Sequence, residues 1–132
     1  MSVFENSDQL YNVLKITFSR MHQKYPEAAN KVTRSRLLLR MRTSSPTTET
    51  NINGRHNPAE VTYGPSTQRA DIELDLPAEM LHRILMGELS LKTAYASGKI
   101  KLRGPLWRAL ILADIFQYSQ AVYPQVMKDL EI

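Results

Sequence analysis

Apolar and polar residues alternate in five short segments of the chain, and each of these segments predicts a β-strand. The alternation is clearest in residues 70–76, where Ile72 and Leu74 fall on one side and acidic residues on the other. Successive side chains of a strand point to opposite faces, so this segment predicts one buried and one solvated face. The dipeptide Asn53-Gly54 predicts a turn after the second segment. The predicted strands span residues 35–43, 47–53, 59–63, 70–76 and 99–103.

Other segments repeat their apolar residues at helical spacing. Leu10, Leu14 and Phe18 recur every four residues and predict a helix over residues 8–24. We expect this helix to end before Pro26, and the residues between Pro26 and the first strand to form a polar link. The later predicted helices begin at Pro77, Ser90, Pro105 and about Pro124.

The order of these elements is helix, four strands, two helices, strand and two helices, which is typical of the α+β class. We therefore expect a five-stranded mixed, mostly antiparallel sheet with helices covering one face. The fifth strand follows a helical excursion, which leaves a parallel pairing open to it. At 132 residues the chain is one domain by size, with an N-terminal helix (1–30), a sheet-and-helix core (35–117) and a C-terminal helical segment (118–132).

The segment from Gly98 to Phe116 joins a half-charged strand to a helix that is apolar on almost every side. The strand carries three basic residues on one face and two apolar residues on the other. Between Leu106 and Phe116 only Arg108 and Asp114 are charged. Such a helix must be covered on most sides by core, by a partner or by an apolar ligand.

Composition narrows the class of protein further. The chain is 42% hydrophobic and 23% charged, as in ordinary globular domains. It has no cysteine, which excludes disulfides and thiol catalysis and fits a reducing compartment. No apolar run approaches the roughly 18 residues of a membrane-spanning helix, and the N-terminus lacks the features of a secretory signal. We expect a soluble, cytoplasmic protein.

The sequence offers no arrangement that is typical of catalysis. His22, His56 and His82 are scattered over different predicted elements, and no two of them stand at a metal-ligand spacing. The chain has no nucleophile elbow and no glycine-rich phosphate loop. We expect no enzyme activity, no catalytic residue, no metal and no cofactor.

The C-terminal half contains a characteristic series of motifs. The strand ADIELDL precedes a helix and a Gly-x-Leu step at Gly87, a short alanine-containing helix follows, and GKIKLRG at Gly98–Gly104 leads to a last apolar helix. This series resembles the sterol carrier protein 2 (non-specific lipid transfer protein) family. The match is specific over residues 70–116. The resemblance implies a five-stranded sheet covered on one face by helices, with an apolar tunnel that takes fatty acyl chains, acyl-CoA, sterols or phospholipids.

We expect the apolar side chains of the last strand, the last long helix and the elements opposite them to line such a tunnel. A spacing of this kind also suits a filled core, so both interpretations remain open. Each buried methylene of an acyl chain contributes about 0.8 kcal/mol, so even a narrow tunnel could hold one without a polar anchor. Met41, Met80 and Met86 would help it adapt to ligands of different shape. The candidate lining residues are Ile72, Leu74, Ile84, Leu85, Ile100, Leu102, Leu106, Trp107, Leu110 and Ile111.

Basic residues gather on the first and last predicted strands, and the formal net charge is +4. We expect these residues to pair across strands with Asp71, Glu73 and Asp75. The alternative is contact with an anionic membrane surface or with coenzyme A phosphates, helped by exposed apolar residues such as Trp107 or Phe116. Acidic residues are dispersed among the basic ones, so no nucleic-acid binding is expected. The basic residues are Arg34, Arg36, Arg40, Arg42, Lys99, Lys101 and Arg103.

Two classes of function remain open at this point. The first is a small domain that binds an apolar lipid and possesses a cavity for it. The second is an interaction module of the same fold with a filled core, which uses the apolar helix and residues 118–132 to form a homodimer or to bind a partner. The size of the cavity distinguishes them.

Overall fold

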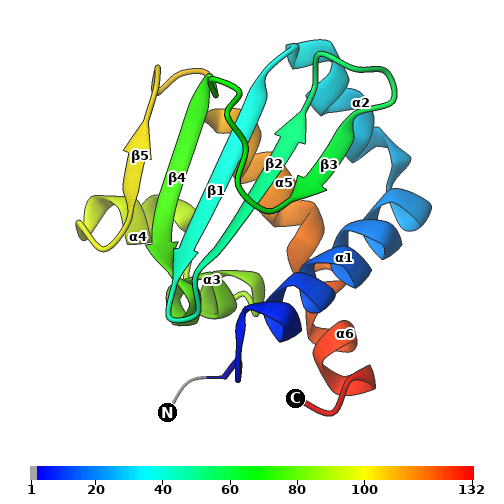
Figure 1. Cartoon of the computed structure of the whole chain (residues 1–132), viewed down its shortest axis with the longest axis vertical. Coiled ribbons are helices and arrows are strands. Elements are labelled where there is room, and N and C mark those ends of the chain that lie inside the picture. The colour runs from blue at the N-terminus through cyan, green and yellow to red at the C-terminus, as the bar shows by residue number, and fades with distance from the viewer. Residues whose placement is uncertain (1–2) are drawn as a thin grey trace.

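The computed structural model describes residues 3–132, in which a five-stranded sheet is covered on one face by helices (Figure 1). The helices are α1 (Ser7–Lys24), α2 (Pro26–Ser35), α3 (Ala78–Leu85), α4 (Leu91–Ala96), α5 (Leu110–Gln120) and α6 (Tyr123–Asp129). The strands are β1 (Leu38–Ser44), β2 (Thr48–Asn53), β3 (Glu60–Tyr63), β4 (Ile72–Pro77) and β5 (Lys101–Arg103). All five predicted strands are confirmed, and each begins one to three residues later than expected.

The strand order is β3-β2-β1-β4-β5, and only β1 and β4 run parallel. The expected α+β class and mixed, mostly antiparallel sheet are confirmed. The parallel pairing left open for the fifth strand is wrong, because β5 runs antiparallel to β4 with Leu102 opposite Leu74. Instead, the chain leaves β3 at one edge, crosses the outer face of β2 and β1 through residues 64–71, and adds β4 beside β1 (Figure 1).

The N-terminal region forms two helices where we expected one. Asn6 caps α1 by accepting a hydrogen bond from the backbone N–H of Gln9 (2.8 Å). The expected polar link after Pro26 is wrong, since Pro26 begins α2. Proline suits the first turn of a helix, where its missing N–H would have no intrahelical partner. Ala28 and Val32, one turn apart, bury the inner side of α2. Residues 1 and 2 of the expected N-terminal helix lie outside the described residues.

The pairing register separates the two faces of the sheet. Leu39 and Met41 of β1 lie opposite Ile52 and Thr50 of β2, on the side that faces the helices. Arg40, the residue between them, lies on the opposite, outer side. The helix side of the sheet therefore supplies the core, and the outer side carries the charges.

The last long helix begins five residues later than predicted. Residues 105–109 form a turn, in which Pro105 O accepts hydrogen bonds from the N–H groups of Arg108 (3.0 Å) and Ala109 (3.2 Å), and α5 starts at Leu110. We expected this segment to be covered on most sides, but Leu106 and Trp107 at its beginning are exposed. Phe116, which the alternative of membrane contact placed among the exposed apolar residues, is buried.

Gly54, at the end of β2, allows a close approach between backbone segments. Its N–H donates to Leu37 O (2.8 Å), and a Cβ at this position would lie 2.3 Å from Val32 O. The predicted Asn53-Gly54 turn is present, although the chain needs residues 54–59 before β3 begins.

In residues 3–132, no helix has both the length and the hydrophobicity that crossing a bilayer would require.

Candidate ligand cavity

Two neighbouring cavities lie between the inner face of the sheet and helices α1, α2 and α5. The inner cavity measures about 30 Å³ and the outer cavity about 190 Å³. Phe18, Ile52 and Ile115 line both of them and stand between them. The inner cavity is lined by Leu14, Thr17, Phe18, Leu39, Arg40, Met41, Thr50, Ile52, Leu81, Leu85, Leu112, Ile115, Phe116 and Ser119.

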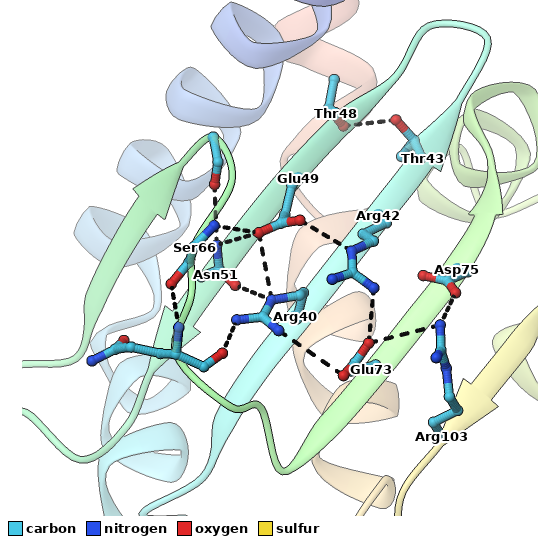
Figure 2. A network of polar contacts seen from close by, with 12 residues as sticks. Arg40, Arg42, Thr43, Thr48, Glu49, Asn51, Ser66, Glu73, Asp75 and Arg103 are labelled. Carbon is cyan, nitrogen blue, oxygen red and sulfur yellow. Dashed lines mark hydrogen bonds and ion pairs between the residues drawn. The ribbon is translucent and has the colours of Figure 1, made fainter.

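The wall of the inner cavity is almost wholly hydrocarbon. Arg40 extends its charged end to the outer face of the sheet (Figure 2). The hydroxyls of Thr17 and Ser119 donate to backbone carbonyls of their own helices, at Val13 O (2.8 Å) and Ile115 O (2.8 Å). Thr50 Oγ1 is buried and has no hydrogen-bond partner within residues 3–132. A wall of this kind suits an alkyl chain or ring and offers no site for a charge.

The outer cavity is partly open to solvent between the two N-terminal helices and the segment that leads into β3. Ala29 and Val32 of α2 form one wall, and Ala59 and Val61 form the opposite wall. The exposed side chain of His22 stands at its edge and adds a polar group there. The site is therefore apolar inside and more polar at its entrance.

The structure separates the ten predicted lining residues into three groups. Leu85 lines the inner cavity. None of the other nine lines either of the two cavities. The predicted inward orientation is wrong for three others, because Leu106, Trp107 and Leu110 are 59%, 74% and 68% exposed. The remaining six are buried or partly buried in the core: Ile72, Leu74, Ile84, Ile100, Leu102 and Ile111. A role in lipid binding stays a prediction for all ten.

Sequence reasoning placed the lining on the C-terminal half and missed the contribution of the N-terminal half. Leu14 and Phe18 stand one turn apart on α1, a spacing that did predict a helix with one apolar face. Leu39 and Met41 share one face of β1. The periodicity identified these faces, but it carried no information on which faces meet at a void. Of the three methionines expected to adapt a tunnel, only Met41 lines a cavity; Met80 is buried elsewhere and Met86 is exposed.

The outer face of the sheet carries a network of charged residues (Figure 2). Arg42 bridges Glu49 and Glu73 at 3.0 Å each, and Arg103 contacts Asp75 at 2.5 Å. The expected cross-strand pairing is confirmed for these arginines. Asp71 pairs instead with Arg55 (2.8 Å), a residue that we had not considered.

Arg40 is the most buried member of this network, with 5% of its side chain exposed. Its Nε donates to Asn51 Oδ1 (2.7 Å) and lies 3.5 Å from Glu49 Oε2, and a terminal nitrogen donates to Gln68 O. Ser66 N–H donates to the same Glu49 oxygen (2.7 Å). We call Arg40, Glu49, Asn51, Ser66 and Gln68 the Arg40 cluster. Through Ser66 and Gln68, this cluster attaches the β3–β4 connection to the outer face of the sheet.

The surroundings of Glu49 favour its ionised form. Burial by itself raises the pKa of Glu49, but hydrogen bonds from Arg42, Ser66 and Asn51 outweigh burial and leave the pKa below its ordinary value. The carboxylate is thus held as a charged partner for the arginines of β1.

The expected cross-strand pairing is not found for the two lysines near the other edge of the sheet. Neither Lys99 nor Lys101 forms an ion pair within residues 3–132.

His82 on α3 lies against Tyr123 of α6, with 2.8 Å between its Nδ1 and the tyrosine hydroxyl. Burial lowers the pKa of His82, although the charges of Glu88 and Glu79 act in the opposite direction. Because the unfolded chain then binds the proton more readily than the folded one, stability is complete above the ordinary value of 6.5 and decreases as the pH falls below it.

We expect His82→Gln to remove this pH-dependent component of stability. Thermal unfolding followed from pH 7.5 to about 5 should show a smaller loss of stability in the variant than in the natural chain. The carboxyls of Glu49 and Asp71 titrate in a lower range, since the pKa of each lies below its ordinary value. Equal slopes for both proteins between pH 7 and 5 would contradict this role of His82.

Potential metal ligands do not gather at one place in the described residues. In residues 3–132, no group of three or more histidine, aspartate or glutamate side chains is placed to hold a metal ion. The carboxylates on the outer face are engaged with arginines and line neither cavity.

No protein-family model and no curated protein sequence matches the chain. Solved structures do match it. The sterol carrier protein domain 2 of Helicoverpa armigera superposes with a TM-score of 0.66 at 21% identity, covering 85% of this chain and 88% of that one. Sterol carrier protein 2 of Yarrowia lipolytica, in its apo form, gives 0.63 at 18% identity, with 86% and 91% covered. The chain has the sterol carrier protein 2 fold.

A third solved structure with this fold is described as palmitated. Palmitated SCP2L2 of Aedes aegypti superposes with a TM-score of 0.56 at 20% identity, covering 79% of this chain and 90% of that one. The resemblance read from residues 70–116 and the superposition of most of the chain thus point to the same sterol carrier protein 2 fold.

Proposed function

We propose that this sterol carrier protein 2-fold chain binds an apolar lipid in the cavities between its sheet and helices α1, α2 and α5. The observation that carries the proposal is the pair of adjoining cavities with an apolar interior and a more polar entrance. The palmitated mosquito relative supports a fatty acyl chain as the first ligand to test. Fatty acids, acyl-CoA, sterols and phospholipids all present hydrocarbon that such a wall would cover.

The cavity volumes indicate how a ligand would enter. An apolar cavity of roughly 150 Å³ binds benzene, so the outer cavity at about 190 Å³ accepts a comparable hydrocarbon segment. The inner cavity, at about 30 Å³, has room for little more than the end of a chain. Rotation of Phe18, Ile52 or Ile115 would join the two spaces, and the flexible side chain of Met41 would adapt its shape to the chain end.

Native extraction and titration test the proposal. Purified protein is extracted with organic solvent and analysed by mass spectrometry, and a fluorescent fatty acid is titrated into delipidated protein. We expect a co-purified lipid and saturable binding that unlabelled palmitate displaces. Absence of both would contradict the proposal.

The proposal includes exchange of the ligand at an anionic membrane surface, in the cytoplasm, without catalysis. The absence of cysteine supports a reducing compartment. The lack of a metal-binding group in residues 3–132 and the engagement of the outer carboxylates with arginines support a non-enzymatic role without a cofactor.

A second function, an interaction module, is favoured by one observation. The small inner cavity leaves the core nearly filled, while Leu106, Trp107 and Leu110 are exposed and available to a partner or a second copy. Light scattering distinguishes the two functions. A stable dimer without ligand binding would support the interaction module, and a monomer that binds lipid would contradict it.

A further inference from the structure

Three large apolar side chains stand together at the connection between β5 and α5. Leu106, Trp107 and Leu110 are 59%, 74% and 68% exposed, more than any other large apolar side chain in residues 3–132. Single exposed apolar residues are ordinary, but three within five positions form a patch that water solvates poorly. We call these three residues the apolar patch.

The local backbone holds the apolar patch in place. Ala109 lies between its members, is 7% exposed and anchors the turn that begins at Pro105. Gly104 packs so closely on β4 that a Cβ there would lie 2.5 Å from Asp71 O. The segment is therefore fixed at its inner side, and its exposed apolar side chains are the outer side of an ordered turn.

The chain segment that carries the apolar patch is basic. Residues 98–113 include four cations and no acid. Arg103 is engaged with Asp75, and Arg108 lies 5.5 Å from the centre of the Trp107 ring. Lys99 and Lys101 have exposed side chains and no ion pair in the described part of the chain. The segment that carries the apolar patch therefore combines exposed hydrocarbon with two lysines that no ion pair engages within the described residues.

We propose that the apolar patch docks the protein on an anionic lipid bilayer, with Trp107 at the level of the headgroups. Tryptophan favours the interface between headgroups and acyl chains, where its ring is covered and its N–H stays hydrated. Lysine and arginine beside it are attracted to anionic lipids. A bilayer accepts protruding side chains without a matching groove, whereas a protein partner would need a concave acidic surface.

The position of the apolar patch connects docking to the cavity. Leu110 begins α5, and Leu112, Ile115 and Phe116 of the same helix line the inner cavity. Docking therefore places the helix that carries one cavity wall at the surface that would supply the ligand. The idea that the bilayer supplies the ligand rests on the proposed function. Docking on the bilayer can be measured without any ligand.

Trp107 is the only tryptophan in the chain, so its fluorescence reports on docking directly. Full-length protein is mixed with vesicles of phosphatidylcholine and phosphatidylserine in a 70:30 ratio (about 30% anionic lipid, for a strong surface potential). We expect co-sedimentation, a blue shift of the emission, and quenching by lipids brominated on their acyl chains. Pure phosphatidylcholine and about 1 M salt should both weaken binding, because they remove or screen the surface charge.

Matched variants separate the apolar patch from a general effect of charge or hydrophobicity. Leu106→Ser combined with Leu110→Ser should weaken vesicle binding by about tenfold or more. Met86→Ser and Tyr95→Ser alter exposed apolar residues elsewhere and should leave it unchanged. Lys99→Gln with Lys101→Gln should weaken binding to anionic vesicles by several-fold, and Lys128→Gln should not.

The outcomes distinguish this proposal from the proposed function. Absence of vesicle binding, or equal binding by the double serine variant, overturns docking by the apolar patch even where fatty acid titration succeeds. Docking without any ligand binding supports the patch and contradicts the cavity proposal. Self-association that the double serine variant abolishes, without vesicle binding, assigns the patch to a protein interface and overturns the proposal. Circular dichroism of each variant confirms that it is folded.

Discussion

Replacement of Ala29 by phenylalanine is expected to weaken ligand binding while the protein stays folded. Ala29 is half-buried on α2 and lines the outer cavity of about 190 Å³. The larger ring would occupy space that an acyl chain needs, and each methylene denied burial removes about 0.8 kcal/mol of binding free energy. We therefore expect fatty acid affinity to fall by about tenfold or more. Because the ring enters a void, stability should be unchanged or slightly increased.

A fluorescent fatty acid titration measures this effect, and thermal unfolding monitors the fold. Ala59→Phe approaches the same cavity from the opposite wall and should have the same effect on binding. Ala96→Phe adds the same ring at an exposed position away from both cavities and serves as the matched control. Full affinity in both Ala29→Phe and Ala59→Phe would mean that the ligand does not occupy the outer cavity.

Replacement of Arg40 by methionine is expected to lower the free energy of unfolding by about 3 kcal/mol or more, the largest loss of stability among the variants proposed for this protein. The arginine side chain is 5% exposed and contacts Glu49, Asn51 and the carbonyl of Gln68. Methionine preserves much of the volume but leaves these buried polar groups without their donor. Loss of the contact to Gln68 also frees the β3–β4 connection from the sheet.

Chemical denaturation of the natural chain and the variants tests this prediction. Arg42→Met is the matched control on the same strand face, because Arg42 is 39% exposed and its ion pairs are partly solvated. We expect the control to lose about 1 kcal/mol or less. A cost for Arg40→Met no larger than that of Arg42→Met would show that burial of the Arg40 cluster adds nothing to stability.

Acidification should weaken the outer network in a different pH range from that of His82. The pKa values of Glu49 and Asp71 are both held below their ordinary values, so their contribution is complete above about pH 4.5 and is lost on further acidification. The decrease assigned to His82 begins at about 6.5 and precedes it.

The sequence determined the local structure of the chain well. Alternation in residues 70–76 required a strand with one wet face, and its acidic face meets the basic face of β1 as expected. The spacing of Leu10, Leu14 and Phe18 required a helix with one buried side. These features follow from the side-chain periodicity of strands and helices. This periodicity spans only a few residues, so it can be recognised in a single sequence.

Errors arose where two interpretations shared one pattern. Pro26 both ends one helix and begins the next, because proline lacks an N–H and suits a first turn. The apolar run after Gly104 also suited a helix from Pro105, but the close approach of Gly104 to Asp71 fixes a turn first. The side chains of Leu106 and Trp107 consequently face solvent.

The cavity depended on tertiary structure alone. Leu39 and Ile52 are neighbours only because β1 and β2 pair in one register, and Phe18 and Ile115 reach them only because α1 and α5 cover the same face. Periodicity states which side of an element is buried, whereas the volume left between buried sides depends on how sheet and helices are spaced. The sequence by itself thus determined the elements, their apolar faces and the fold class. Only the packing of distant segments decided where space remains for a ligand and which apolar residues stay exposed.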